Sequence, residues 1–130
     1  MPYQQFDETR PYLVNNTFDH AASAGIPLAL GWNTAGVSRL DAWAISSTDT
    51  IDHVIDVGVY TSGIIIQMAT ITIPAGAGQG TVPVVDVLAA IWGTALHYIM
   101  SAGNNDYAIQ LDVVVSTGKL LEVTLMGGGF

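Results

Sequence analysis

From residue 26 onward, apolar and polar positions alternate along the chain in short runs. The clearest run covers residues 52–61, where His53, Ile55 and Val57 would share one face of a strand. Alternation with a period of two is typical of a β-strand. A tight turn at residues 62–63 leads directly into a second run at 64–73, so the pattern predicts a β-hairpin that ends before a proline.

Similar but shorter patterns predict the other strands. We expect strands at residues 12–14, 26–32, 40–46, 96–100 and 107–116, and a second hairpin formed by 107–116 with 119–126. In the run at 40–46, one face would hold Leu40, Ala42, Ala44 and Ser46. These short strands are separated by turn-forming residues, which is the spacing of an antiparallel β protein.

One helix is expected, from residue 83 to about residue 94. Asp86 or a nearby residue would begin it, and Val87, Leu88, Ile91 and Trp92 recur with helical spacing. Seven or eight strands with one short helix in a crossover predict an all-β fold. The expected architecture is a β-sandwich of jelly-roll or immunoglobulin-like type. The length of 130 residues fits one such domain, which we place at residues 26–130.

Residues 1–25 show no dominant period, and we expect them to form an extended N-terminal arm. The chain ends in three glycines and a phenylalanine. Aromatic side chains in the arm and at the C-terminus are candidates for filling pockets on a neighbouring subunit. These candidate interface residues are Tyr3, Phe6, Tyr12, Phe18 and Phe130.

The charge balance narrows the function classes. Charged residues make up 11% of the chain, and 3 basic residues face 11 acidic ones, for a net charge of −8. A nucleic-acid binder or a protein that docks on anionic lipid needs basic surface, so neither is expected. No apolar stretch has the length of a membrane span, and the N-terminus lacks the pattern of a signal peptide. A surface with few charges is expected where other subunits cover it, which favours a homo-oligomer.

No motif in the sequence indicates catalysis, a cofactor or a metal. The glycines at 76, 78 and 80 lack the spacing of a dinucleotide-binding loop. Asp52 and Asp56 would point away from His53 in a strand, so three metal ligands do not converge there. There is no cysteine and no nucleophile elbow. We therefore expect a protein without enzymatic activity.

Two alternatives from other classes remain open. The tryptophans at 32, 43 and 92, together with five tyrosines, could line a sugar-binding face, which predicts a carbohydrate-binding module for host attachment. A small hydrolase would place His53 or His97 beside a serine or a carboxylate in a cleft.

The run from Asp49 to Trp92 resembles small β-sandwich proteins encoded among the virion structural genes of tailed bacteriophages. The step I-T-I-P-A-G-A-G at residues 71–78, which leads into the short P-V-V-D-V-L segment, carries most of the resemblance. Residues 120–130 are similar to the ends of such chains. The resemblance implies a protein of the phage particle that contacts its own copies and other virion proteins. It implies a capsid decoration (cement) protein, or alternatively a neck or tail adaptor.

Overall fold

The computed structural model describes residues 10–32, 37–93, 99–102 and 106–129, and all structural statements below concern these residues. They form nine strands and one short helix. In chain order these are β1 (Arg10–Phe18), β2 (Leu28–Ala29), β3 (Val37–Ser47), β4 (His53–Thr61), β5 (Ile64–Ile73), β6 (Val85–Asp86), α1 (Val87–Trp92), β7 (Ile99–Ala102), β8 (Asp106–Leu111) and β9 (Leu121–Gly129).

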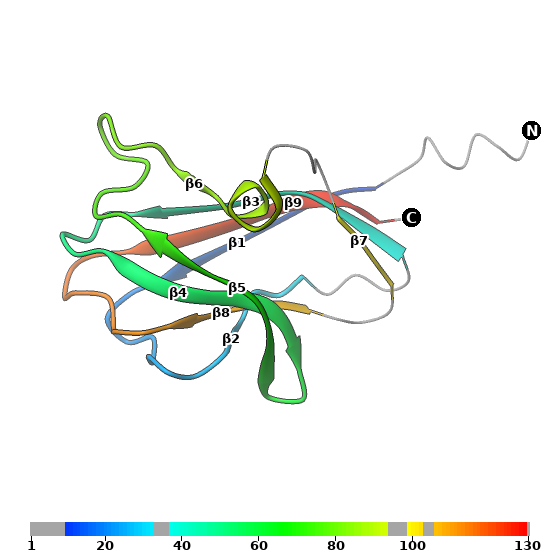
Figure 1. The fold of residues 1–130 in the computed structure, drawn as a ribbon, viewed down its shortest axis with the longest axis horizontal. Coiled ribbons are helices and arrows are strands. Elements are labelled where there is room, and N and C mark those ends of the chain that lie inside the picture. The colour runs from blue at the N-terminus through cyan, green and yellow to red at the C-terminus, as the bar shows by residue number, and fades with distance from the viewer. Residues whose placement is uncertain (1–9, 33–36, 94–98, 103–105, 130) are drawn as a thin grey trace, which may run out of the picture.

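The strands form two sheets that face each other. Sheet A has the order β1-β9-β3-β6, with β7 also paired to β3, and sheet B has the order β2-β8-β4-β5. Every strand pair is antiparallel. Figure 1 shows sheet A across the upper half of the molecule and sheet B across the lower half. This arrangement confirms the predicted all-β sandwich.

The hydrophobic core lies between the two sheets. On β4 the side chains of His53, Ile55 and Val57 share one face, as the sequence pattern predicted, and all three are fully buried. Trp32 and Trp43 are the largest of the buried side chains. Both sheets therefore contribute one apolar face each, and this burial supplies most of the favourable free energy of folding.

The β4–β5 hairpin is confirmed, together with its two-residue turn. Ser62 and Gly63 both have positive φ angles, 51° and 81°. Two positive angles define the type I′ turn, which suits the twist of a hairpin. Further along, Val57 pairs with Ala69 and Gly58 pairs with Gln67, which leaves Met68 as a β-bulge.

A second bulge, in β3, makes the predicted grouping of its side chains on one face wrong. Leu40 pairs with Gly127 and Ala42 with Met126, so Asp41 is an extra residue. The extra residue reverses the alternation, because each inserted position turns all later side chains to the opposite face. Leu40 therefore shares its buried face with Trp43, Ile45 and Ser47, and not with Ala42, Ala44 and Ser46 as predicted.

The predicted second hairpin is wrong. β8 ends at Leu111 and pairs with β2 and β4 in sheet B, whereas β9 pairs with β1 and β3 in sheet A. Residues 112–120 carry the chain from one sheet to the other. The apolar alternation that begins at Tyr107 extends to Val115, but Val113 is 40% exposed in the crossing segment. The apolar alternation in the sequence therefore extends beyond the end of β8 at Leu111.

The helix is shorter than predicted, with six residues, and its start at Asp86 is confirmed. The Asp86 carboxylate accepts a hydrogen bond from the Ala89 amide at 3.1 Å, which caps the helix. Residues 85–86 before it pair with β3 as β6 and are extended. Val87 and Leu88 are buried in the core, so α1 closes the side of the sandwich between β3 and β5.

Two other predicted strands also have different bounds. Of residues 26–32, only Leu28 and Ala29 form ladder pairs, both with β8. The strand expected at 96–100 is described only from Ile99, as part of β7, and residues 94–98 lie outside the described part of the chain.

The described part of the expected N-terminal arm is a strand of the sandwich itself. All nine residues of β1 pair with β9. Tyr12, Val14 and Phe18 recur at even spacing along β1 and pack against the core. The segment after β1 is also attached, because the Gly25 amide donates a hydrogen bond to the Leu111 carbonyl oxygen at 2.8 Å.

Candidate functional site

The aromatic residues expected at subunit contacts divide into two groups. Tyr12 packs edge-on against Trp32, with ring centroids 4.9 Å apart and an angle of 83° between the planes. Phe18 is half-buried against the same core. Both therefore stabilise their own domain. Tyr3, Phe6 and Phe130 lie outside the described residues, so their contact with a neighbour stays a prediction.

Among the residues that the structure describes, His53 and Asp49 form a buried pair of titratable side chains. His53 Nε2 lies 2.8 Å from Asp49 Oδ2, and both side chains are fully buried. The same carboxylate accepts hydrogen bonds from the amides of Thr50 and Ser116, at 2.7 and 2.9 Å. Asp49 thus joins the β3–β4 loop, the start of β4 and the segment that crosses between the sheets.

This environment decides the charge of Asp49. Burial alone would raise the pKa of its carboxyl group, because it disfavours the charged form. Hydrogen bonds from Ser116, His53 and Thr50 stabilise the carboxylate more strongly, and the pKa is held well below its usual range. The pair lies in the core without exposed surface, so no substrate reaches it. Of the two histidines expected in a hydrolase, His97 lies outside the described residues.

The other acidic residues near His53 serve the local backbone. Asp52 accepts a hydrogen bond from the Ala75 amide at 2.8 Å, and Asp56 accepts one from the Thr70 hydroxyl at 2.7 Å. Both side chains lie on the outside of the sheet, opposite to His53. In the described ranges, no group of three His, Cys, Asp or Glu side chains is placed to hold a metal ion.

The glycine-rich loop before β6 owes its shape to its own backbone. Gly76, Gly78 and Gly80 all have positive φ angles. The Gly78 amide donates to the Val82 carbonyl oxygen at 2.8 Å, and the Gln79 amide donates to the Gly76 carbonyl oxygen at 2.8 Å. The glycines are therefore explained by turn geometry.

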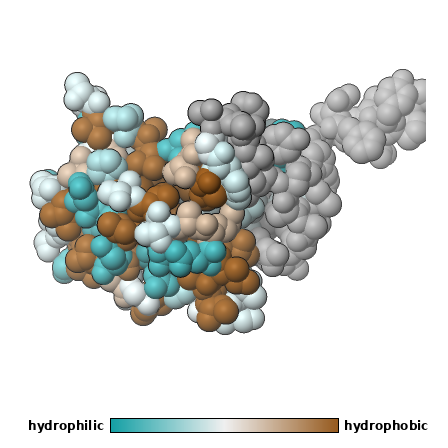
Figure 2. Space-filling model, viewed as in Figure 1, coloured by the Kyte–Doolittle hydropathy of each residue, from teal (hydrophilic) through white to brown (hydrophobic). Residues whose placement is uncertain are grey.

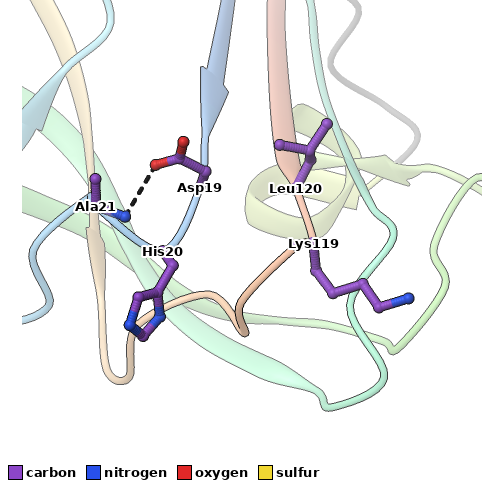
Figure 3. Close-up of a pocket in the computed structure, with 6 residues that line it drawn as sticks. Asp19, His20, Ala21, Lys119 and Leu120 are labelled. Carbon is purple, nitrogen blue, oxygen red and sulfur yellow. Dashed lines mark hydrogen bonds between the residues drawn. The ribbon is translucent and has the colours of Figure 1, made fainter.

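A shallow, open depression lies where β1 ends and β9 begins. It is lined by Asp19, His20, Ala21, Gly118, Lys119 and Leu120. Figure 3 shows that the His20 ring and the Lys119 side chain point in different directions. His20 Nδ1 lies 2.8 Å from the Val115 carbonyl oxygen, and Asp19 accepts a hydrogen bond from the Ala21 amide. These polar groups are engaged locally and do not converge on a common ligand.

The tryptophans do not form a sugar-binding face. Trp32 and Trp43 are 0% and 1% exposed, so neither ring can stack on a sugar. Trp92, at the end of α1, is 41% exposed. The aromatic side chains of the described residues thus serve mainly the core.

The most unusual surface feature is the apolar exterior. Large apolar side chains at least 40% exposed are Leu13, Ile26, Ile51, Val54, Ile64, Ile66, Val84, Trp92, Val113, Leu120 and Met126. Leu13 and Met126 are direct neighbours across β1 and β9. Ile64 and Ile66 lie at the end of the β4–β5 hairpin, where Figure 2 shows hydrophobic residues gathered at the bottom of the view.

Sequence reasoning did not single out Ile64 and Ile66, although a signal was present. Residues 64–66 are three consecutive isoleucines at the start of a strand. Successive side chains in a strand point to opposite faces, so a single core face cannot bury all three. Such a run indicates either a strand covered on both faces or an apolar surface that is left exposed.

Comparisons with known proteins identify no relative: no family model, curated protein or solved structure matches the chain. The helix in the described part of the chain is not long and apolar enough to cross a membrane. Any function must therefore follow from the residues and their geometry.

Proposed function

We propose that this chain is a non-enzymatic structural protein of a phage particle, and specifically a capsid decoration protein. The observation that carries the proposal is the exterior of the sandwich, which combines few charges with exposed apolar side chains. Two of these side-chain pairs, Leu13 with Met126 and Ile64 with Ile66, form local clusters and are not isolated. Clustered apolar surface of this kind is typical of protein contact sites.

The physical role would be to bury this surface at junctions between subunits. Each apolar side chain removed from water contributes favourable free energy, and many copies would add their contributions over a shell. The net charge of −8 suits a position on the outside of the shell, away from packaged DNA. The resemblance of residues 49–92 to virion sandwich proteins supports the same role.

The proposal is tested on phage particles purified from an infected culture of the bacterial host. We expect the chain to band with intact particles in a density gradient, in a copy number comparable with that of the main shell protein. Particles made without the chain should assemble and then lose DNA at a lower temperature than complete ones. A copy number of only a few per particle would assign the chain to the neck or tail, and absence from particles would overturn the proposal.

A further inference from the structure

Strand β5 is an open edge of sheet B. Among the described residues its backbone hydrogen-bonds only to β4, and no other segment pairs with its outer side. It is ten residues long, and of the other edge strands only β1 is comparable, with nine residues, whereas β2, β6 and β7 have two, two and four. An open edge of this length presents a row of unpaired amide and carbonyl groups to another strand.

The edge lacks the charged residues and prolines that commonly prevent strand pairing. Residues 64–73 contain no charged side chain and no proline. Natural edge strands are usually protected by such residues, by bulges or by a covering segment. β5 has one bulge, at Met68, and α1 contacts β5. Figure 1 shows that the hairpin end of the strand projects away from α1 and beyond the sandwich.

Ile64 and Ile66 leave an exposed apolar surface at this projecting end of the hairpin. Ile66 lies opposite Val59, and Ile64 lies opposite Thr61, so both face the same side as the buried Val57. Ile64 and Ile66 are nevertheless 59% and 56% exposed, because the hairpin extends past the facing sheet. The hairpin end therefore offers backbone hydrogen-bonding groups and uncovered apolar side chains at one place.

We propose that this edge pairs with the β5 edge of a second copy of the chain. Two identical edges are complementary to each other when they run antiparallel across a two-fold axis. The two four-stranded sheets B would then become one continuous eight-stranded sheet. Each copy has a net charge of −8, so two copies repel, but β5 carries no charged side chain and therefore adds no contact between like charges along the paired strands.

This inference deepens the proposed assembly role by naming one contact surface, but it concerns two isolated copies in solution. Failure of the pair would leave incorporation into particles open, and absence from particles would leave the pair intact. The two proposals are therefore separately testable.

The test compares the full chain with Ile66→Lys and Ile26→Lys by sedimentation over a concentration series. Both substitutions replace an exposed apolar side chain and add one positive charge, but only Ile66 lies on the β5 edge. We expect the wild-type chain and Ile26→Lys to dimerise with similar dissociation constants. Ile66→Lys should raise the dissociation constant about tenfold or more, because a lysine on the edge must lose its hydration.

Hydrogen exchange of the same three proteins identifies the contact. We expect amides in residues 64–67 to be protected in the wild-type dimer and to exchange faster in Ile66→Lys, while core amides of β9 are unchanged. A wild-type chain that stays monomeric at all concentrations would overturn the proposal. So would a dimer that Ile26→Lys dissociates and Ile66→Lys does not, or a dimer in which β5 gains no protection.

Discussion

A single carboxylate, that of Asp49, connects the β3–β4 loop and the start of β4 to the crossing segment at Ser116, which is distant in sequence. It accepts hydrogen bonds from the amides of Thr50 and Ser116 and contacts His53, and 67 positions separate it from Ser116. Removing one partner from a buried, hydrogen-bonded charged group is costly, because the remaining groups stay desolvated without compensation. Asp49 thus explains how the crossing segment is fixed to the sandwich.

Replacing Asp49 should therefore lower the free energy of unfolding. We expect Asp49→Asn to cost about 2–4 kcal/mol at neutral pH, because buried donors lose a charged acceptor. Asp56→Asn is the matched control on the outer face of β4, where the Asp56 carboxylate accepts only the Thr70 hydroxyl among the described residues, and it should cost less than about 1 kcal/mol. Urea unfolding of the three proteins measures the difference. Equal midpoints for both variants would contradict this role of Asp49.

The same residue predicts the acid sensitivity of the fold. The pKa of Asp49 is lower in the folded chain than the value of about 3.9 expected when unfolded. Its contribution to stability is therefore complete above about pH 4 and is lost as the pH falls below that value. Unfolding free energies measured between pH 7 and pH 2 should decline less steeply in Asp49→Asn than in the wild type. Parallel pH profiles of the two proteins would show that carboxylates other than Asp49 determine the acid sensitivity.

Gly58 is required by a close approach of two backbones at the Met68 bulge. A Cβ atom at position 58 would overlap the carbonyl oxygen of Ile66, and that backbone is fixed by the hairpin ladder. We expect Gly58→Ala to cost about 3 kcal/mol or more. Gly25→Ala is a useful control, because Gly25 has a φ of 74° but open space around it, and strain alone should cost about 1–2 kcal/mol. A smaller loss in Gly58→Ala than in the control would contradict the bulge geometry.

At the scale of elements, β1 is the strand whose observed role differs most from the role predicted from the sequence. It forms a nine-residue ladder with β9 and brings Tyr12, Val14 and Phe18 onto the core. We expect a chain that begins at Arg10 to keep its melting temperature within a few degrees. A chain that begins at Asp19 should lose cooperative unfolding, because β9 becomes an open edge and the core loses three side chains. Circular dichroism melts distinguish the two, and a cooperative melt of the shorter chain would contradict the assignment.

The elements that sequence patterns predicted well are those fixed by neighbouring residues. The β4–β5 hairpin depends on Ser62-Gly63, and the start of α1 depends on Asp86. The two bulges were not predictable in this way, because the extra residues Asp41 and Met68 are defined only by the register of the opposite strand. The same holds for the crossing at residues 112–120, where apolar alternation continues but the chain changes sheet.

The candidate contact surface was predictable only in part. Tyr12 and Phe18 were expected at a subunit contact, yet their even spacing with Val14 already matched a strand with one buried face. The exposure of Ile64 and Ile66 depends on how far the hairpin projects past sheet A, and this distance is a property of the whole fold. Aromatic content was thus a poorer guide to exposed apolar side chains than the run of three isoleucines.

At the scale of the whole molecule, the net charge of −8 opposes any self-association. If two copies meet at the uncharged β5 edge, the repulsion between their remaining charges is screened by salt, and the Debye length shortens from about 30 Å at 0.01 M to about 8 Å at 0.15 M. We therefore expect the dimer dissociation constant to fall several-fold over this range of sodium chloride, and sedimentation at each salt concentration measures it. Ion pairs at the contact would give the opposite trend, since salt weakens attraction between unlike charges. A dissociation constant that rises with salt would place the contact at charged residues and away from β5.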